Sequence, residues 1–248
     1  MQPNIYAHRG ASKQAPENTM AAFSLAYKQG ADGIETDVHL TKDYIPVLIH
    51  DEHVKRTTNG TGYIKDYTFR DLQQLDAGSW FSPEFAGSRI ISLDECLKWI
   101  YDKPLHLNIE LKNNKIDYNR LERIVYDRIS HYHLLHRTTL STFNPISVSR
   151  LKHLNQYIGV ALLTSKRYKN LVAAAEDLGA NAIHIKYRLL NRLLVDQSRQ
   201  KNLALRVYTV NKPKHMIRSF SMGCDGIFTD IPEMAVHYRN QFGDQPMK

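Results

Sequence analysis

A regular alternation of apolar and amphipathic segments constrains the fold of this chain more than any other feature. Apolar runs of strand length alternate with longer runs whose apolar residues recur at helical spacing. Strands are predicted at residues 5–7, 32–37, 105–111, 138–141, 158–162, 182–185, 204–210 and 226–229, and helices at 19–29, 92–101, 117–131, 145–154, 168–178, 189–201, 213–222 and 232–239. Eight strand–helix units in 248 residues predict a TIM (β/α)8 barrel. An open, doubly wound sheet would also alternate, but with less reason to stop at eight strands.

The length and composition favour one domain. A chain of 248 residues with 42% hydrophobic residues can bury one sizeable core, so we expect one barrel domain over residues 1–248, with two smaller domains as the alternative. Residues 51–91 interrupt the alternation and are rich in Gly, Thr, Ser and Asp. Long irregular segments in compact domains are usually functional, so we expect an insertion over one end of the barrel. Ser92 and Glu95 form a capping-box pattern that predicts the next helix.

The second strand is expected to continue into a β-hairpin arm. Two alternating runs flank the polar residues 42–43, which predicts a two-residue turn at that point. This turn would place Glu35 opposite His50 and Asp37 opposite Leu48. Directly opposed residues share one face of a hairpin, so Glu35, Asp37 and His50 are expected to point in the same direction.

Two neighbours of these residues are set apart from the predicted site. His39 shares the face of Glu35 and Asp37 by alternation, but it lies nearer the tip of the arm. We therefore expect His39 to be solvated or to act as a lid. Asp51 follows His50 directly and is expected to point away from the site, so it is left outside the catalytic set.

Ionisable residues gather at the carboxyl ends of the predicted strands, where the active sites of TIM barrels lie. They are His8 and Arg9 after the first strand, Glu35 and Asp37 with His50 of the arm after the second, and Glu110 and Lys112 after the third. Three carboxylates without a nearby cysteine favour Mg²⁺ or Ca²⁺ over zinc. Two histidines can divide proton transfer, and the basic residues can bind an anionic group. Displacement at a phosphodiester is the chemistry that uses all of these groups together. The metal and the basic side chains neutralise phosphate oxygens, and the histidines move protons at the attacking and leaving oxygens.

Several sequence blocks resemble the signature of the glycerophosphodiester phosphodiesterase family. They are His8-Arg9-Gly10, Pro16-Glu17-Asn18-Thr19, Glu35-Thr36-Asp37-Val38, His50-Asp51, Glu110-Leu111-Lys112, Ser141-Thr142-Phe143-Asn144, Tyr208-Thr209-Val210-Asn211 and residues 223–232. The blocks follow the family's order and come near its spacings. The resemblance implies a metal-dependent TIM-barrel hydrolase that converts a small glycerophosphodiester into sn-glycerol 3-phosphate and an alcohol.

The resemblance also implies roles for the residues that match. Glu35, Asp37 and Glu110 would hold the divalent ion, Mg²⁺ or Ca²⁺, and His8 and His50 would form the general acid/base pair. In the mechanism proposed for the family, the glycerol hydroxyl of the substrate attacks phosphorus and the resulting cyclic phosphate is then hydrolysed. Either histidine could be the base in a given step.

Four further residues would bind the substrate if the resemblance holds. Arg9 would contact the phosphate and Lys112 would lie beside it, while Glu17 would orient Arg9 or assist at the metal. Tyr208 stands where many relatives carry Trp, so it keeps an aromatic wall. This difference leaves the preferred alcohol open.

Two other functions fit parts of the sequence. A related two-histidine lysophospholipase or phospholipase that acts on membrane lipid would need an exposed apolar rim, for which Trp80, Phe81 and Phe85 are the candidates. A catalytically inert barrel that serves as a binding module would need broken catalytic positions, and none of these positions is broken.

Charge and hydropathy limit the partners and the location. The formal net charge of +8 favours anionic ligands, but the 33 Lys and Arg residues are scattered, which argues against nucleic acid. The basic run 166–169 is expected to begin a helix in solvent, with a weak peripheral contact to a membrane as the alternative. No run approaches the roughly 18 apolar residues of a membrane span, and the first residues lack a leader pattern. A cytoplasmic location is therefore expected.

Overall fold

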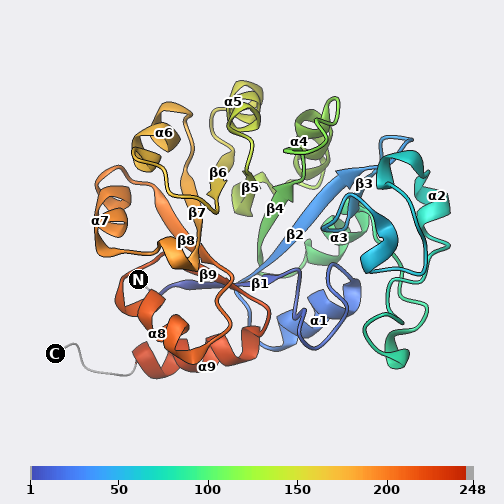
Figure 1. The fold of residues 1–248 in the computed structure, drawn as a ribbon, viewed down its shortest axis with the longest axis horizontal. Helices are drawn as coiled ribbons and strands as arrows, with labels where there is room; N and C mark the ends of the chain where they lie inside the picture. The colour runs from blue at the N-terminus through green and yellow to red at the C-terminus, as the bar shows by residue number, and fades with distance from the viewer. Residues whose placement is uncertain (1, 244–248) are drawn as a thin grey trace.

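A closed parallel barrel forms the centre of the protein in the computed structural model, which describes residues 2–243 (Figure 1). Within these residues, the wall consists of β1 (Asn4–His8), β2 (Gly33–Leu40), β4 (His106–Leu111), β5 (Thr138–Thr142), β6 (Gly159–Thr164), β7 (Ala182–Lys186), β8 (Ala204–Tyr208) and β9 (Gly226–Thr229). β1 pairs in parallel with both β2 and β9, which closes the barrel. The predicted TIM barrel is confirmed.

Helices lie outside the barrel, between consecutive strands and after the last one (Figure 1). They are α1 (Met20–Lys28), α3 (Leu93–Ile100), α4 (Leu121–His131), α5 (Pro145–Leu154), α6 (Leu171–Asp177), α7 (Arg192–Gln200), α8 (Pro213–Ser221) and α9 (Pro232–Gly243). The bounds of α5 are those predicted. The largest differences are at the start of α4 and the end of α9, because helix ends depend on capping and packing that the apolar pattern does not encode.

Capping side chains determine where two of these helices begin. Thr19 accepts a hydrogen bond from the backbone N of Ala22 at 3.3 Å, at the start of α1. Ser92 Oγ accepts from the backbone N of Glu95 at 3.2 Å, and Glu95 Oε2 accepts from the backbone N of Ser92 at 2.7 Å. Both halves of the predicted capping box are therefore formed at α3.

The arm is a β-hairpin of β2 and the short antiparallel strand β3 (Pro46–Leu48), but the predicted register is wrong by one residue. Leu48 pairs with Val38, whereas the sequence pattern placed it opposite Asp37. A shift of one residue exchanges the two faces of a strand. The predicted alignment of Glu35 with His50 therefore does not arise from cross-strand pairing.

The turn of the arm explains the shift. Thr41 donates its backbone N–H to the carbonyl of Ile45 at 3.1 Å, so three residues and not two lie within the turn. Tyr44 takes a positive φ of 61°, as in three-residue hairpin loops that end with a left-handed residue. The sequence pattern did not show that Tyr44 belongs to the turn, because an aromatic residue is typical of a strand.

Residues 52–91 form an insertion beside β3 and α3 (Figure 1). The insertion contains α2 (Phe69–Leu72) and three short 3₁₀ turns. It has its own apolar cluster, separate from the main core of the barrel. The buried members of this cluster are Val47 and Ile49 of the arm with Val54, Ile64, Leu72, Ala77 and Ile90 of the insertion. The insertion is thus packed against the arm and helps to fix its position.

The features that would favour membrane lipid are weakly developed. Trp80 is 39% exposed, while Phe81 and Phe85 are half-buried and pack edge to face with ring centroids 5.6 Å apart. In the part of the chain that the structure describes, no helix combines the length and the apolar character needed to cross a membrane. Of the three candidate aromatic residues, only Trp80 is exposed, so these residues do not form a broad apolar rim.

Candidate active site

A cavity of about 300 Å³ opens at the carboxyl ends of the barrel strands. It is lined by most of the predicted site residues, namely His8, Arg9, Glu35, His50, Glu110, Lys112 and Tyr208. The other two, Asp37 and Glu17, contact Arg9 from behind this lining. The structure therefore brings all the predicted residues to one place, in a cavity at the lower end of the size range for small-molecule sites.

Glu35, Asp37 and Glu110 form one acidic group. β2 and β4 are neighbours in the barrel, and their register pairs Asp37 with Glu110. One carboxylate oxygen from each residue lies within 4.8 Å of those from the other two. The three residues are only 4%, 1% and 9% exposed. Buried carboxylates this close repel one another unless positive charge lies beside them.

Two basic side chains supply part of that positive charge. Arg9 Nε lies 3.2 Å from Asp37 Oδ2, and Lys112 Nζ lies 2.8 Å from Glu110 Oε1 and 3.6 Å from Asp37 Oδ1. Asn18 donates a hydrogen bond to Asp37 Oδ2 at 3.0 Å. Burial alone would raise the pKa of Asp37, but Arg9 and Lys112 hold it well below its usual value. Asp37 is therefore ionised.

The charge of Glu35 is less well compensated. Burial and the neighbouring Asp37 raise the pKa of Glu35 to about 8. In addition, Asp37 Oδ1 is buried and accepts no hydrogen bond from residues 2–243. A divalent cation would stabilise the ionised Glu35 and give this oxygen a partner. The donor set consists only of carboxylate oxygens and therefore fits a hard cation such as Mg²⁺ or Ca²⁺.

His8 is held at the end of β1 by a carboxylate that follows β9. Its Nδ1 lies 2.7 Å from Asp230 Oδ1, and Asp230 also accepts hydrogen bonds from Ser12 and Asn211. Burial lowers the pKa of His8, but Glu35 and Asp230 outweigh burial and raise it above its usual value. With Nδ1 engaged, Nε2 is the ring nitrogen that remains for proton transfer.

His50 has a similar carboxylate partner at the end of the arm. Its Nδ1 lies 2.6 Å from Asp51 Oδ1, so the expectation that Asp51 points away from the site is wrong. The backbone N of Ile49 donates to the carbonyl of Asp37 at 3.1 Å and ties the arm to β2 beyond the last strand pair. His50 therefore reaches the cavity through a bend after β3, and its Nε2 remains for proton transfer.

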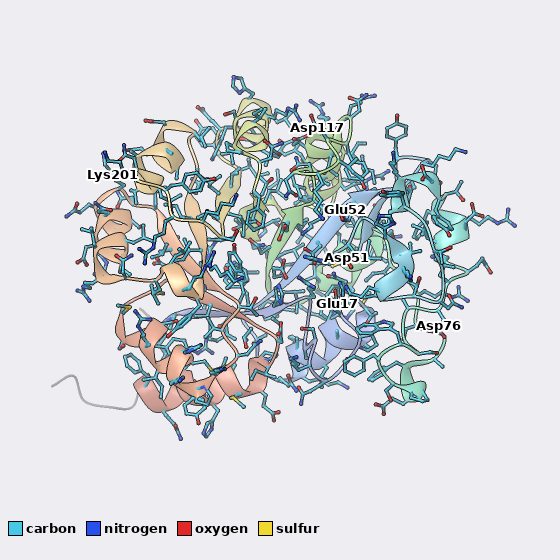
Figure 2. The ribbon with its side chains drawn as sticks, in the orientation of Figure 1. Glu17, Asp51, Glu52, Asp76, Asp117 and Lys201 are labelled. Atoms are coloured by element: carbon cyan, nitrogen blue, oxygen red, sulfur yellow. The ribbon has the colours of Figure 1, made fainter. Side chains whose placement is uncertain are left out.

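Arg56 of the insertion joins the arm to the loop after β1. Its guanidinium donates to both oxygens of Asp51 at 2.7 and 3.2 Å and to both oxygens of Glu17 at 2.8 Å. Glu17 in turn accepts a hydrogen bond from Arg9 at 2.9 Å. Figure 2 shows Glu17 and Asp51 on the side of the barrel that carries the insertion. These contacts favour the orienting role of Glu17 over a role at the metal.

Aromatic and amide side chains complete the cavity. The rings of Tyr208 and Phe143 meet edge to face with centroids 6.3 Å apart, so Tyr208 lies in an aromatic wall. Asn108 donates a hydrogen bond to Ser141 at 2.9 Å. Among residues 2–243, the buried Asn108 Oδ1 and the Tyr208 hydroxyl have no hydrogen-bond partner. Both atoms are therefore available for the hydroxyl groups of a ligand.

His39 is buried, contrary to the expectation of a solvated or lid residue. Its exposed fraction is 0%. Its Nδ1 lies 2.9 Å from the Tyr118 hydroxyl, and its Nε2 lies 3.1 Å from the carbonyl oxygen of His50. Burial lowers the pKa of His39 to about 4, so the ring is neutral near pH 7. His39 braces the backbone of the arm next to His50.

Within residues 2–243, three charged residues outside the predicted set form ion pairs with members of it. Asp230 follows the last strand, and because the barrel closes onto the first strand, this position had to lie near His8. For Asp51, the signal was its place next to His50 in the chain. Arg56 lies in the insertion, where the sequence showed no periodicity from which its contacts could be inferred.

Comparison with known protein families shows to which family the chain belongs. The sequence model of the glycerophosphoryl diester phosphodiesterase family matches residues 8–234. The chain belongs to this family. A Bacillus subtilis (strain 168) relative is 42% identical over 236 residues, which are 94% of this chain and 96% of that protein. The glycerophosphodiester phosphodiesterase of Caldanaerobacter subterraneus subsp. tengcongensis is 39% identical over 237 residues, 96% of this chain and 98% of that protein.

Solved structures agree with this assignment. A phosphodiesterase of Oleispira antarctica, determined in complex with the product sn-glycerol-3-phosphate, is 30% identical, with a TM-score of 0.87 over 96% of this chain and 97% of that chain. A glycerophosphodiester phosphodiesterase of Agrobacterium tumefaciens str. C58 is 29% identical, with a TM-score of 0.85 over 95% and 99% of the two chains. The predicted family and enzyme class, a phosphoric diester hydrolase, are confirmed.

Proposed function

We propose that this enzyme hydrolyses glycerophosphodiesters to sn-glycerol 3-phosphate and an alcohol, with a divalent metal and with His8 and His50 as the acid/base pair. One observation carries the proposal: both histidines have Nδ1 on a carboxylate and line the cavity that also contains the acidic group. The whole chain would act as one catalytic domain, and the cytoplasmic location expected from the sequence remains a prediction.

The acidic group would hold the metal. Glu35, Asp37 and Glu110 supply the oxygen ligands that Mg²⁺ and Ca²⁺ prefer, and the two positive charges of the metal would offset most of their three negative charges. When bound, the ion supplies positive charge that stabilises the negative oxygens of the phosphodiester in the transition state. A bound divalent ion would also favour the ionised form of Glu35 near pH 7, which the raised pKa of Glu35 otherwise opposes.

Arg9 and Lys112 would bind the phosphate. Both side chains line the cavity, and both are held by carboxylates of the acidic group or of Glu17. A guanidinium and an ammonium fixed in this way neutralise phosphate oxygens without having to reorganise during the reaction. Glu17 would therefore act through Arg9, as a positioning residue.

The two histidines would move the protons of both steps. In the first step, one histidine accepts the proton of the attacking glycerol hydroxyl at Nε2, and the other donates its proton to the oxygen of the leaving alcohol. A cyclic glycerol phosphate results. In the second step, water attacks this phosphate, the histidine that lost its proton takes one from the water, and the other returns one to the glycerol oxygen. Both histidines thus regain their starting states.

Metal removal tests this proposal. Hydrolysis of glycerophosphocholine and glycerophosphoethanolamine should stop when the enzyme is treated with a chelator and should return with Mg²⁺ or Ca²⁺. Calorimetric titration of the chelated enzyme with each ion should show one site, and Glu110→Gln should weaken binding there because it removes a charged ligand. Turnover that is indifferent to the metal would contradict the role of the carboxylates.

A further inference from the structure

The mouth of the cavity has two halves that differ in charge. One half consists of the loops after β1, the arm and β4, and its carboxylates are paired. Arg56 binds Glu17 and Asp51, as described above. Lys115 Nζ lies 3.0 Å from Glu52, and an arginine of α5 lies 2.8 Å from Asp117. Figure 2 shows these four carboxylates on one side of the molecule. The charges of this half largely cancel.

The other half consists of the loops after β5, β6, β7 and β8 and contains no acidic residue. Between Asp127 and Asp225 the sequence has only three acids, Glu176, Asp177 and Asp196, and all of them lie within α6 and α7. The exposed cations of these loops, together with the last residue of β7, are Lys166, Arg167, Lys169, Lys186, Arg188 and Lys212. We call these six residues the cationic half-rim.

The carboxylates of α6 and α7 do not neutralise the half-rim. Glu176 lies 2.9 Å from Lys201, near the far end of α7, and Asp196 lies 3.2 Å from Arg192. Within residues 2–243, no carboxylate lies at ion-pair distance from any of the six cations. The net positive potential at the mouth therefore lies on one side.

Lys186 connects this half-rim to the reaction. It is the last residue of β7, is exposed, and also lines the cavity. The floor of the cavity is closed by side chains such as Asn108, Ser141 and His184, which are 2%, 0% and 0% exposed. A closed floor suits the small glycerol part that all substrates share. The variable alcohol has to extend through the mouth, past Lys186.

From this geometry we infer that the enzyme prefers glycerophosphodiesters whose alcohol is itself anionic. The inference rests on the proposed function and names the substrate class of the same site. Unpaired cations beside the leaving alcohol attract a phosphate or carboxylate on that alcohol and repel the ammonium of choline or ethanolamine. The preference resides in binding of the alcohol and not in the acid/base chemistry.

A panel of three soluble substrates tests the inference. Glycerophosphocholine has a cationic alcohol, glycerophosphoglycerol a neutral one, and glycerophosphoglycerol with a terminal phosphate an anionic one. We expect kcat/KM at low salt to rise in that order, by on the order of tenfold or more between the ends of the series, since a charged cleft concentrates charged ligands to that extent. Most of the change should be in KM. The difference in kcat/KM between the two ends of the series should become smaller at 0.5 M salt, because salt screens the charges of the half-rim.

The variant Lys186→Glu tests whether the substrate preference depends on the cationic half-rim, and Lys28→Glu is the matched control. Lys28 is exposed in the last turn of α1, at the opposite end of the barrel, and its substitution changes the net charge equally. Lys186→Glu should raise KM for the anionic alcohol several-fold and leave KM for glycerophosphocholine unchanged or lower. Lys28→Glu should reproduce the wild-type order.

The outcomes separate the inference from the proposed function. Hydrolysis of all three substrates with equal kcat/KM at low salt would overturn the inference and leave the function intact, whereas failure to hydrolyse any of them with metal present would overturn the function. Equal turnover together with sedimentation on vesicles of anionic phospholipid, lost in Lys186→Glu, would overturn the inference in favour of a membrane-binding face.

Discussion

The two histidine–carboxylate pairs of the site are similar in geometry and different in origin. His8 and Asp230 lie 222 positions apart in the chain and meet where the barrel closes, and their side chains are 18% and 17% exposed. His50 and Asp51 are adjacent in sequence and lie at the end of the arm, with side chains 32% and 31% exposed. One pair thus belongs to the barrel wall and the other to an appendage.

Each pair depends on different support. Asp230 follows β9, whose pairing with β1 places Ala7 beside Thr229, and it is further held by Asn211 and Ser12. Asp51 is held by Arg56, which comes from the insertion. The comparison teaches that barrel closure positions one histidine of the proposed acid/base pair, whereas the insertion helps to position the other.

The largest effect is expected from removal of either imidazole. His8→Ala and His50→Ala should each reduce kcat by roughly a hundredfold or more, because each removes one group of the proposed acid/base pair. Circular dichroism and thermal unfolding should show that both variants stay folded. If one variant kept near-normal turnover, its histidine would have no part in the mechanism and the two pairs would not be equivalent.

Substitution of the carboxylate partner should affect the two pairs to different extents. Burial raises the pKa of Asp230, but the hydrogen bond from His8 and the other donors outweigh burial and keep it below its usual value, so this partner is ionised. Asp230→Asn should reduce kcat by about tenfold or more, since an amide neither stabilises the imidazolium nor fixes the tautomer. Asp51→Asn should reduce kcat less, because this pair is more exposed to water. Steady-state kinetics of both variants would measure the difference, and equal losses would contradict it.

Substitution of Arg56 tests whether the insertion supports only the pair of His50 and Asp51. Arg56→Ala should lower kcat several-fold through Asp51 and raise KM through Glu17 and Arg9, because it removes hydrogen bonds to both carboxylates. Arg56→Lys keeps the charge but not the bidentate contacts, so we expect only partial recovery. Full activity in Arg56→Ala would show that the arm is held by its apolar contacts alone.

Ser92→Ala should have the smallest effect. Ser92 begins α3 where the insertion ends, and it bridges to Val47 of the arm. Loss of the cap should lower the free energy of unfolding by about 1 kcal/mol, measured by chemical denaturation, and leave kcat unchanged. A loss of activity in the folded variant would show that the arm depends on the start of this helix.

Much of the candidate site was predictable because it follows from local order along parallel strands. His8 ends β1 and pairs with Glu35 of β2, while Asp37 of β2 pairs with Glu110 near the end of β4. The carboxyl ends of barrel strands meet on one rim. Their convergence needed only the correct strand assignment.

The prediction for the arm was less successful. His50 reaches the cavity, but by a bend and not by the predicted pairing, because Tyr44 lengthens the turn by one residue. His39 shares the strand alternation of Glu35, yet it is buried under the arm by contacts to Tyr118 and to the backbone of His50. Alternation indicates the face of a strand and does not indicate what covers that face.

By itself, the sequence determined the alternation of strands and helices, the eight-unit barrel and the residues that end each strand, because these depend on hydrophobic periodicity and on chain order. Only the tertiary structure decided the partners across long separations. Asp230 meets His8 because the barrel closes, and Arg56 meets Asp51 and Glu17 because the insertion packs on the arm through its own apolar cluster. Such contacts depend on distances in space that no local pattern encodes.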